Sequence, residues 1–305
     1  MGFFRRWPLI SAAALIGCTA FLFAQQPEFR VNVRLVRLLI TVKDAAGGIV
    51  GGLNRGDFNI YDNGVPQNVA VFERQTEQPL SVATLVDTSG STGIELKYET
   101  DSITRFFNSL VREGNPGDAT AFYTFNWEIT LQHDYTRNVA ALERDTHHLK
   151  GSAGTCLYDA LWMAARALEF REGRHVMVVV TDGGDTTSSK TFQDALEAVQ
   201  RADAVLYPVV VIPITNNAGR NTGGENALTT MAQRTGGRIF LPSLGPSLDQ
   251  AFDDMLRELR TQYFIGYYPR NVPPSSNSYH TLTVKMTDPR LRAITRSGYY
   301  EDSER

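Results

Sequence analysis

The chain has 305 residues, 42% of them hydrophobic and 21% charged, with a formal net charge of -3 at pH 7. This length is sufficient for one large or two modest domains with a real core. The composition is that of an ordinary globular protein, and the slightly negative charge excludes a generally basic surface, so we expect no nucleic-acid partner.

Residues 1–24 have the layout of an export signal. Arg5 and Arg6 precede an apolar run, and Leu22-Phe23-Ala24 is a candidate cleavage site. Two alternatives remain open, because Leu15-Ile16-Gly17-Cys18 resembles a lipoprotein cleavage box and the uncleaved run has about the minimum length of a membrane anchor. We expect an exported protein, periplasmic, secreted or envelope-anchored, that meets a membrane only through this segment if it is uncleaved or lipidated.

The chain holds two cysteines, Cys18 and Cys156. If Cys18 is removed with the export signal, Cys156 remains single and no disulfide can form within the chain. Cys156 stands at the start of an apolar helix, where a cysteine behaves as a small buried hydrophobe rather than as a nucleophile.

Residues 31–76 have the pattern of β structure. Apolar residues alternate along residues 38–42, and Asp62-Asn63-Gly64 separates two β-rich runs, Phe58–Tyr61 and Val69–Phe72. An Asn-Gly pair between such runs is a strong hairpin signal. We expect a small β module that carries out no chemistry.

From Leu80 onward strands and helices alternate, which predicts an α/β fold with a doubly wound, mostly parallel sheet over residues 79–260. The unbroken apolar run Val82–Val86 suits a central strand that is buried on both faces. The other strands are expected at Thr120–Trp127 and Ile129–Tyr135, which form a pair, and at His175–Thr181, Val205–Ile212 and Arg238–Leu241. Helices are expected through Ile103–Leu110, Val139–Leu149, Leu157–Leu168, Thr191–Ala202 and Asn226–Arg234, and in a last helix capped by Ser247.

Oxygen-bearing side chains gather where these strands end. Asp87, Ser89 and Ser91 follow the first strand, Asp182 follows a later one, and Thr155 lies in a loop of small residues between them. In open α/β sheets, ligands bind outside the carboxyl ends of the strands. An Asp-x-Ser-x-Ser run alone more often caps a helix. Here the run indicates a binding site only together with the second strand, which ends at Asp182, and the Thr155 loop.

These residues resemble the metal-ion-dependent adhesion site of the von Willebrand factor type A family, which combines Asp-x-Ser-x-Ser, a Thr in a later loop and an Asp in a Thr-Asp-Gly turn. All five positions are present: Asp87, Ser89, Ser91, Thr155 and Asp182. The resemblance covers roughly residues 79–260, and the whole chain is similar to exported von Willebrand A-related proteins typical of acidobacteria. It implies that the strands ending in Asp87 and Asp182 are neighbours, and that hydroxyls bind the metal directly while at least one Asp acts through water.

Carboxylate and hydroxyl oxygens suit a hard divalent cation, so we expect Mg²⁺, with Mn²⁺ or Ca²⁺ as alternatives. If the family's arrangement applies, few direct ligands are anionic and one coordination position stays open. That position would favour an acidic side chain, so the expected partner is a protein or surface ligand that supplies a carboxylate to the metal.

The segment Pro213–Glu225 is the most irregular loop of the α/β region, and we expect it on the same face as the metal site. It could line the partner surface, with Glu225 able to occupy the open position, or it could be a mobile loop without a role. After it, residues 262–300 return to β character. We expect them to join residues 31–76 in one accessory β unit opposite the metal, because each segment alone has too few strands for stability.

No catalytic motif of a serine hydrolase, zinc protease, nucleotide-binding loop or redox protein occurs in the sequence. We therefore expect no catalytic residues and no enzyme, but an exported protein that mediates divalent-cation-dependent binding. Two alternatives stay open: a hydrolase whose metal activates water, and a scaffold whose metal is purely structural.

Overall fold

The computed structural model describes residues 35–74, 77–89, 96–149, 151–211, 221–243, 245–275 and 277–301, which lie in one compact unit. The expected export signal at residues 1–24 falls outside these ranges. Among the helices that are described, none has the length and apolar character needed to cross a membrane.

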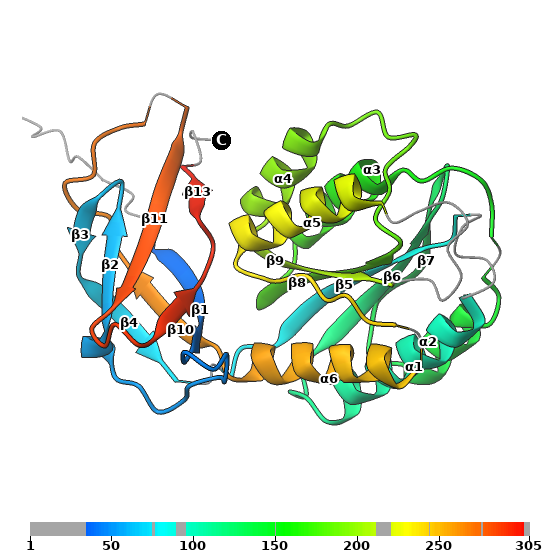
Figure 1. Ribbon diagram of the computed structural model, residues 1–305, viewed down its shortest axis with the longest axis horizontal. Helices are drawn as coiled ribbons and strands as arrows, with labels where there is room; N and C mark the ends of the chain where they lie inside the picture. Colours follow the sequence, from blue (N-terminus) through cyan, green and yellow to red (C-terminus); the bar gives the residue numbers. More distant parts are fainter. Residues whose placement is uncertain are drawn as a thin grey trace, which may run out of the picture. The chain divides into compact units, whose positions relative to one another are not determined.

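A five-stranded sheet forms the centre of the α/β region, with strand order β7-β6-β5-β8-β9 (Figure 1). Its strands are β5 (Leu80–Asp87), β6 (Ala119–Phe125), β7 (Ile129–Thr136), β8 (Arg174–Thr181) and β9 (Ala204–Val210). All neighbours pair in parallel except β7, which is antiparallel to β6. The predicted doubly wound, mostly parallel sheet is confirmed, and β5 and β8 are adjacent as the resemblance implies.

Helices cover both faces of this sheet (Figure 1), and successive residues of β5 face opposite layers. Val82 and Val86 pack in the first layer, whose helices are α1 (Leu96–Arg112), α2 (Val139–Thr146) and α6 (Pro246–Arg260). Ala83 and Leu85 pack in the second, whose helices are α3 (Leu157–Leu168), α4 (Phe192–Arg201) and α5 (Thr222–Thr235). Cys156 is buried in this second layer, as expected.

Two predicted boundaries in this region are wrong. Residues 238–241 form no strand of the sheet, because only Phe240 bridges to Val209. The last helix is capped by Gly245 and not by Ser247, since it begins with Pro246, two residues earlier than a cap at Ser247 implies. Proline suits this position because an N–H in the first turn would have no partner within the helix.

The flanking segments together form two four-stranded sheets, with strand orders β12-β1-β10-β4 and β13-β11-β2-β3. Residues 31–76 supply β1 (Val36–Lys43), the short 3-10 helix η1 (Arg55–Asp57), β2 (Phe58–Asp62), β3 (Val65–Gln67) and β4 (Val69–Glu73). Residues 262–300 supply β10 (Tyr263–Tyr267), β11 (Tyr279–Met286), β12 (Arg292–Ile294) and β13 (Gly298–Tyr300). Each sheet mixes strands of both segments, which confirms the expected accessory β unit.

The hairpin at Asp62-Asn63-Gly64 has a different second strand from the one expected. β2 pairs with β3, and the turn between them places Asn63 and Gly64 at positive φ. The run Val69–Phe72 crosses instead to the other sheet, where β4 pairs with β10. Local turn chemistry thus identified the turn but not the pairing that follows it.

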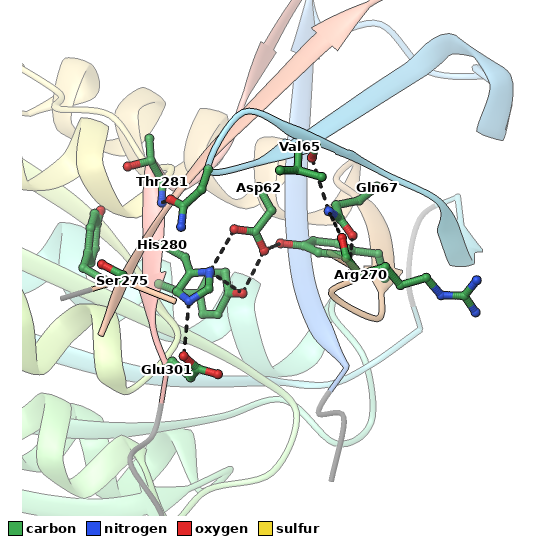
Figure 2. A network of polar contacts seen from close by, with 12 residues as sticks. Asp62, Val65, Gln67, Arg270, Ser275, His280, Thr281 and Glu301 are labelled. Atoms are coloured by element: carbon green, nitrogen blue, oxygen red, sulfur yellow. Dashed lines mark hydrogen bonds and ion pairs between the residues drawn. The ribbon is translucent and has the colours of Figure 1, made fainter. Parts of the chain in front are cut away.

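A buried polar network joins the two segments inside the β unit (Figure 2). Asp62 of β2 is fully buried and accepts hydrogen bonds from the hydroxyls of Tyr267 at 2.7 Å and Tyr299 at 2.8 Å. The Nδ1 atom of His280 lies 2.9 Å from the same carboxylate, and its Nε2 atom lies 3.4 Å from Glu301. These three partners of the Asp62 carboxylate, Tyr267, Tyr299 and His280, all come from the C-terminal β segment, so the carboxylate holds the N-terminal and C-terminal β segments together.

The β unit contacts the α/β region beside the amino ends of the parallel strands. Asp203, directly before β9, is paired with Arg37 at 3.2 Å and with Arg296 at 2.6 Å. The fully buried Glu258 of α6 is paired with Lys43 of β1 at 3.1 Å. The carboxyl ends of the strands, where the predicted ligands lie, are at the opposite edge of the sheet.

Candidate metal-binding site

Asp87 is the last residue of β5, and its side chain is fully buried at the carboxyl end of the strand. Its Oδ1 atom accepts the backbone N–H of Ser89 at 2.8 Å, and its Oδ2 atom accepts the hydroxyl of Thr181 at 2.6 Å. Because Thr181 ends β8 and precedes Asp182, this second bond ties the first predicted ligand to the turn that carries another.

Hydrogen bonds also bring the Thr155 loop to this edge. Ser89 and Ser152 form a parallel bridge, in which the N–H of Ser152 donates to the carbonyl of Thr88 at 2.9 Å. The N–H of Thr155 donates to the hydroxyl of Thr186 at 2.9 Å, and its carbonyl accepts from the N–H of Thr186 at 2.8 Å. The loop that carries Thr155 thus lies between the loops that follow β5 and β8.

Of the five predicted ligands, Asp87, Ser89, Thr155 and Asp182 lie within the described residues, and all four are in loops or strand ends at one edge of the sheet. Ser89 and Thr155 are buried, and Asp182 is half-buried. Ser91 lies outside the described residues. These side chains offer oxygen atoms only, and no group of three or more His, Cys, Asp or Glu suited to a metal occurs in the described part of the chain. A cation here would depend on hydroxyls as well as carboxylates, and such a donor set fits Mg²⁺.

The electrostatics of the site favour positive charge. Burial raises the pKa of Asp87 to about 6, because a carboxylate away from water loses its hydration. The hydrogen bonds from Thr181 and Ser89 lower this pKa, and the charge of Asp182 raises it again. A divalent cation between the two carboxylates would offset both the burial and their mutual repulsion.

Asn126 positions the site and was not predicted from the sequence. It follows β6 at the same edge, where its side-chain amide donates to the hydroxyl of Thr88 at 3.1 Å. Its carbonyl accepts the N–H of Cys156 at 2.7 Å. A polar residue directly after a third parallel strand is the signal that could have identified it. Asn126 therefore connects the Asp87 loop to the Thr155 loop.

Asp185, for which the sequence offers no identifiable partner, also has a positioning role. Its carboxylate accepts the hydroxyl of Ser188 at 2.5 Å and the N–H of Tyr158 in the first turn of α3 at 3.3 Å. One helical position further, Asp159 accepts the N–H groups of Ser189 and Lys190. These bonds fix the loop after Asp182 to the helix after Thr155.

The N-terminus of α5 packs on the turn that follows Asp182. Gly183 has a φ of 96°, in the left-handed region that favours glycine, and Gly224 lies against its carbonyl. Glu225 is buried in the first turn of α5, so the irregular loop predicted to reach this residue ends earlier. The helix begins at Thr222 because Asn221 caps it by accepting the N–H of Gly224. Residues 212–220 of the predicted loop lie outside the described residues.

We expect Gly224→Ala to lower the free energy of unfolding by about 1–3 kcal/mol, as overpacked sites do. A Cβ atom at Gly224 would lie 1.2 Å from the carbonyl oxygen of Gly183, so the Asp182 turn or the helix must move. The matched control is Gly223→Ala, whose Cβ would meet nothing closer than 3.7 Å. Urea unfolding of both variants measures the difference, and equal stabilities would contradict the packing described here.

Comparison with known proteins agrees with the fold and with the class of domain. Residues 82–185 match the family model of the von Willebrand factor type A domain. The match covers β5, β6 and β8 with the loops that follow them, so this part of the chain is similar to a von Willebrand factor type A domain. A comparison with curated protein sequences gives no significant match.

Two solved structures are similar to parts of this chain at low sequence identity. The von Willebrand factor domain of the type V pili tip protein Mfa5 from Porphyromonas gingivalis is 14% identical, with a TM-score of 0.50 over 59% of this chain and 94% of that chain. The conserved hypothetical protein BatB from Bacteroides thetaiotaomicron is 16% identical, with a TM-score of 0.47 over 59% of this chain and 98% of that chain. At 14% identity, the likeness to the Mfa5 domain concerns the fold alone.

Proposed function

We propose that this protein is an exported binding protein that holds a divalent cation at Asp87, Ser89, Ser91, Thr155 and Asp182, and that the cation binds a protein or surface ligand. The observation that carries the proposal is the hydrogen-bonded set of loops that gathers oxygen donors from three separate segments at one sheet edge. Mg²⁺ is the proposed cation, with Mn²⁺ and Ca²⁺ as alternatives, because the donors are all oxygen.

The partner is proposed to supply a carboxylate to the cation. Mg²⁺ takes six oxygen ligands, and the hydroxyls together with water-linked aspartates leave a position for exchangeable water. A partner Asp or Glu in that position gains a charged bond, whereas Lys or Arg would be repelled by the cation. The class of domain supports a protein-interaction role, and the proposed work is binding without catalysis.

The proposal is tested by calorimetry with Mg²⁺ and Mn²⁺, and by capture from the native envelope fraction with and without chelator. We expect one cation per chain and a partner that is released by millimolar chelator. Neutralising the partner's acidic residues by Asp→Asn and Glu→Gln changes should release it as well. Binding that persists without metal would assign the cation a structural role, and metal-dependent hydrolysis of a substrate would favour the enzyme instead.

A further inference from the structure

Trp127 is an exposed aromatic side chain within the loops of the candidate metal site. It stands in the turn between β6 and β7, and its side chain is 61% exposed. The turn itself is held by Asn126, whose N–H donates to the carbonyl of Glu128 at 3.0 Å and whose side-chain oxygen accepts the N–H of Glu128 at 3.1 Å. The hairpin therefore does not depend on the indole, which leaves a large apolar surface in water.

The position of Trp127 relative to the site follows from two contacts. The preceding residue, Asn126, is bonded both to Thr88, next to Asp87, and to Cys156, next to Thr155. A Cβ atom at Gly154 would lie 3.1 Å from the Cβ of Trp127 and 3.2 Å from a methyl group of Thr187. Trp127 therefore lies next to the Thr155 loop, at the same edge of the sheet as the proposed ligands.

The side chain has the character of a binding anchor. In protein interfaces, the residues whose replacement by alanine costs most binding affinity are enriched in tryptophan. The indole buries a large area on binding and loses little conformational entropy. Single exposed aliphatic residues need no explanation, but a mostly exposed indole beside a polar, oxygen-lined site provides what that site lacks, which is apolar contact area.

We propose that Trp127 is the apolar contact of the same partner that the cation binds, and that this partner is a protein segment in which an acidic residue stands beside an apolar one. This inference rests on the proposed function. The acidic residue bonds to the cation, and the neighbouring apolar side chain packs on the indole. The pair gives specificity, because a carboxylate alone would not distinguish a protein segment from any small acid.

The test is selection from a random peptide library displayed on phage, bound to the full chain in Mg²⁺ and released with chelator. The wild-type protein should enrich peptides in which Asp or Glu lies next to a Leu, Ile, Phe or similar residue. Trp127→Ser should still enrich acidic peptides but should lose the apolar preference, and peptides selected on the wild type should bind it at least about tenfold more weakly. Its affinity for Mg²⁺ alone should be unchanged, because the indole donates nothing to the cation.

The control is Phe170→Ser, which removes a side chain that is 83% exposed after α3, at the opposite edge of the sheet. It should select the same peptides as the wild type. Two results would contradict the role of Trp127 without contradicting the metal site. One is that the wild-type protein selects acidic peptides that lack apolar neighbours, and the other is that Trp127→Ser selects the same peptides as the wild type. A selection without acidic residues would overturn the proposed function and this inference together.

Discussion

Replacing Asp62 by Ala should lower the free energy of unfolding by about 3–5 kcal/mol, because several buried hydrogen-bonding groups lose a shared partner at about 1–3 kcal/mol each. The carboxylate is fully buried and is bonded to Tyr267, Tyr299 and His280. Its removal leaves these groups without their acceptor in the interior of the β unit, where each unsatisfied donor carries a desolvation penalty. Because these partners belong to the C-terminal segment, the loss also releases the N-terminal strands from it.

Urea unfolding followed by circular dichroism measures this effect. The control is Asp288→Ala, which removes a carboxylate of the same β unit that is bonded to Arg290 at the surface and should change stability little. Similar unfolding midpoints for the two variants would show that Asp62 does not join the two segments. Asp62→Asn keeps one acceptor oxygen and should fall between Asp62→Ala and the wild type.

Asp87→Asn should weaken the binding of Mg²⁺ and Mn²⁺ by more than about 100-fold. Removing a residue that only forms a hydrogen bond to a metal ligand typically weakens metal binding by about 10- to 100-fold, so a larger loss indicates a ligand. The amide keeps the shape of the side chain but removes the buried negative charge nearest the end of β5. The metal-free variant should fold, because burial already raises the pKa of Asp87 to about 6 and so disfavours its charged form. Titration calorimetry gives the affinity.

The matched control is Asp185→Asn, which makes the same change in charge within the loop after Asp182. Asp185 is not among the proposed ligands, and a single oxygen, Oδ1, accepts its bonds from Ser188 and Tyr158. Asn keeps such an oxygen, so the loop should stay in place and the variant should keep most of the affinity. If both variants lose affinity equally, the cation responds to the general negative charge of the edge and Asp87 is no ligand. Partner capture should follow the metal affinity of each variant.

The α/β region could be predicted closely because its strands are unbroken apolar runs. Val82–Val86 has no polar alternation, and a strand of this kind is stable only between two layers of helices. The β unit was harder, since a hairpin signal specifies a turn and not the partner of the next strand. Val69–Phe72 pairs with β10, almost 200 residues further along the chain, as the strand bounds show. The run Arg238–Leu241 has the composition of a strand, yet only one of its residues bridges to β9.

The four candidate ligands within the described residues could be located from the sequence, because each follows a strand or precedes a helix at the same edge. The residues that hold the loops together could not, since Asn126, Thr181 and Thr186 act through bonds whose partners are distant in sequence. Glu225 was misplaced because a glycine-rich stretch resembles a loop, whereas Asn221 caps a helix there. Gly224 allows that helix to approach the turn after Asp182, and only the folded chain reveals the approach.

The most direct test of the metal site is anomalous diffraction from crystals of the protein soaked in Mn²⁺, with data collected at the manganese absorption edge. The proposal predicts one strong peak at the carboxyl edge of the sheet, within bonding distance of the hydroxyls of Ser89 and Thr155 and close to Asp87 and Asp182. Crystals of Asp87→Asn should lack this peak. A peak elsewhere, or an empty edge in crystals that bind Mn²⁺ at another site, would contradict the assignment.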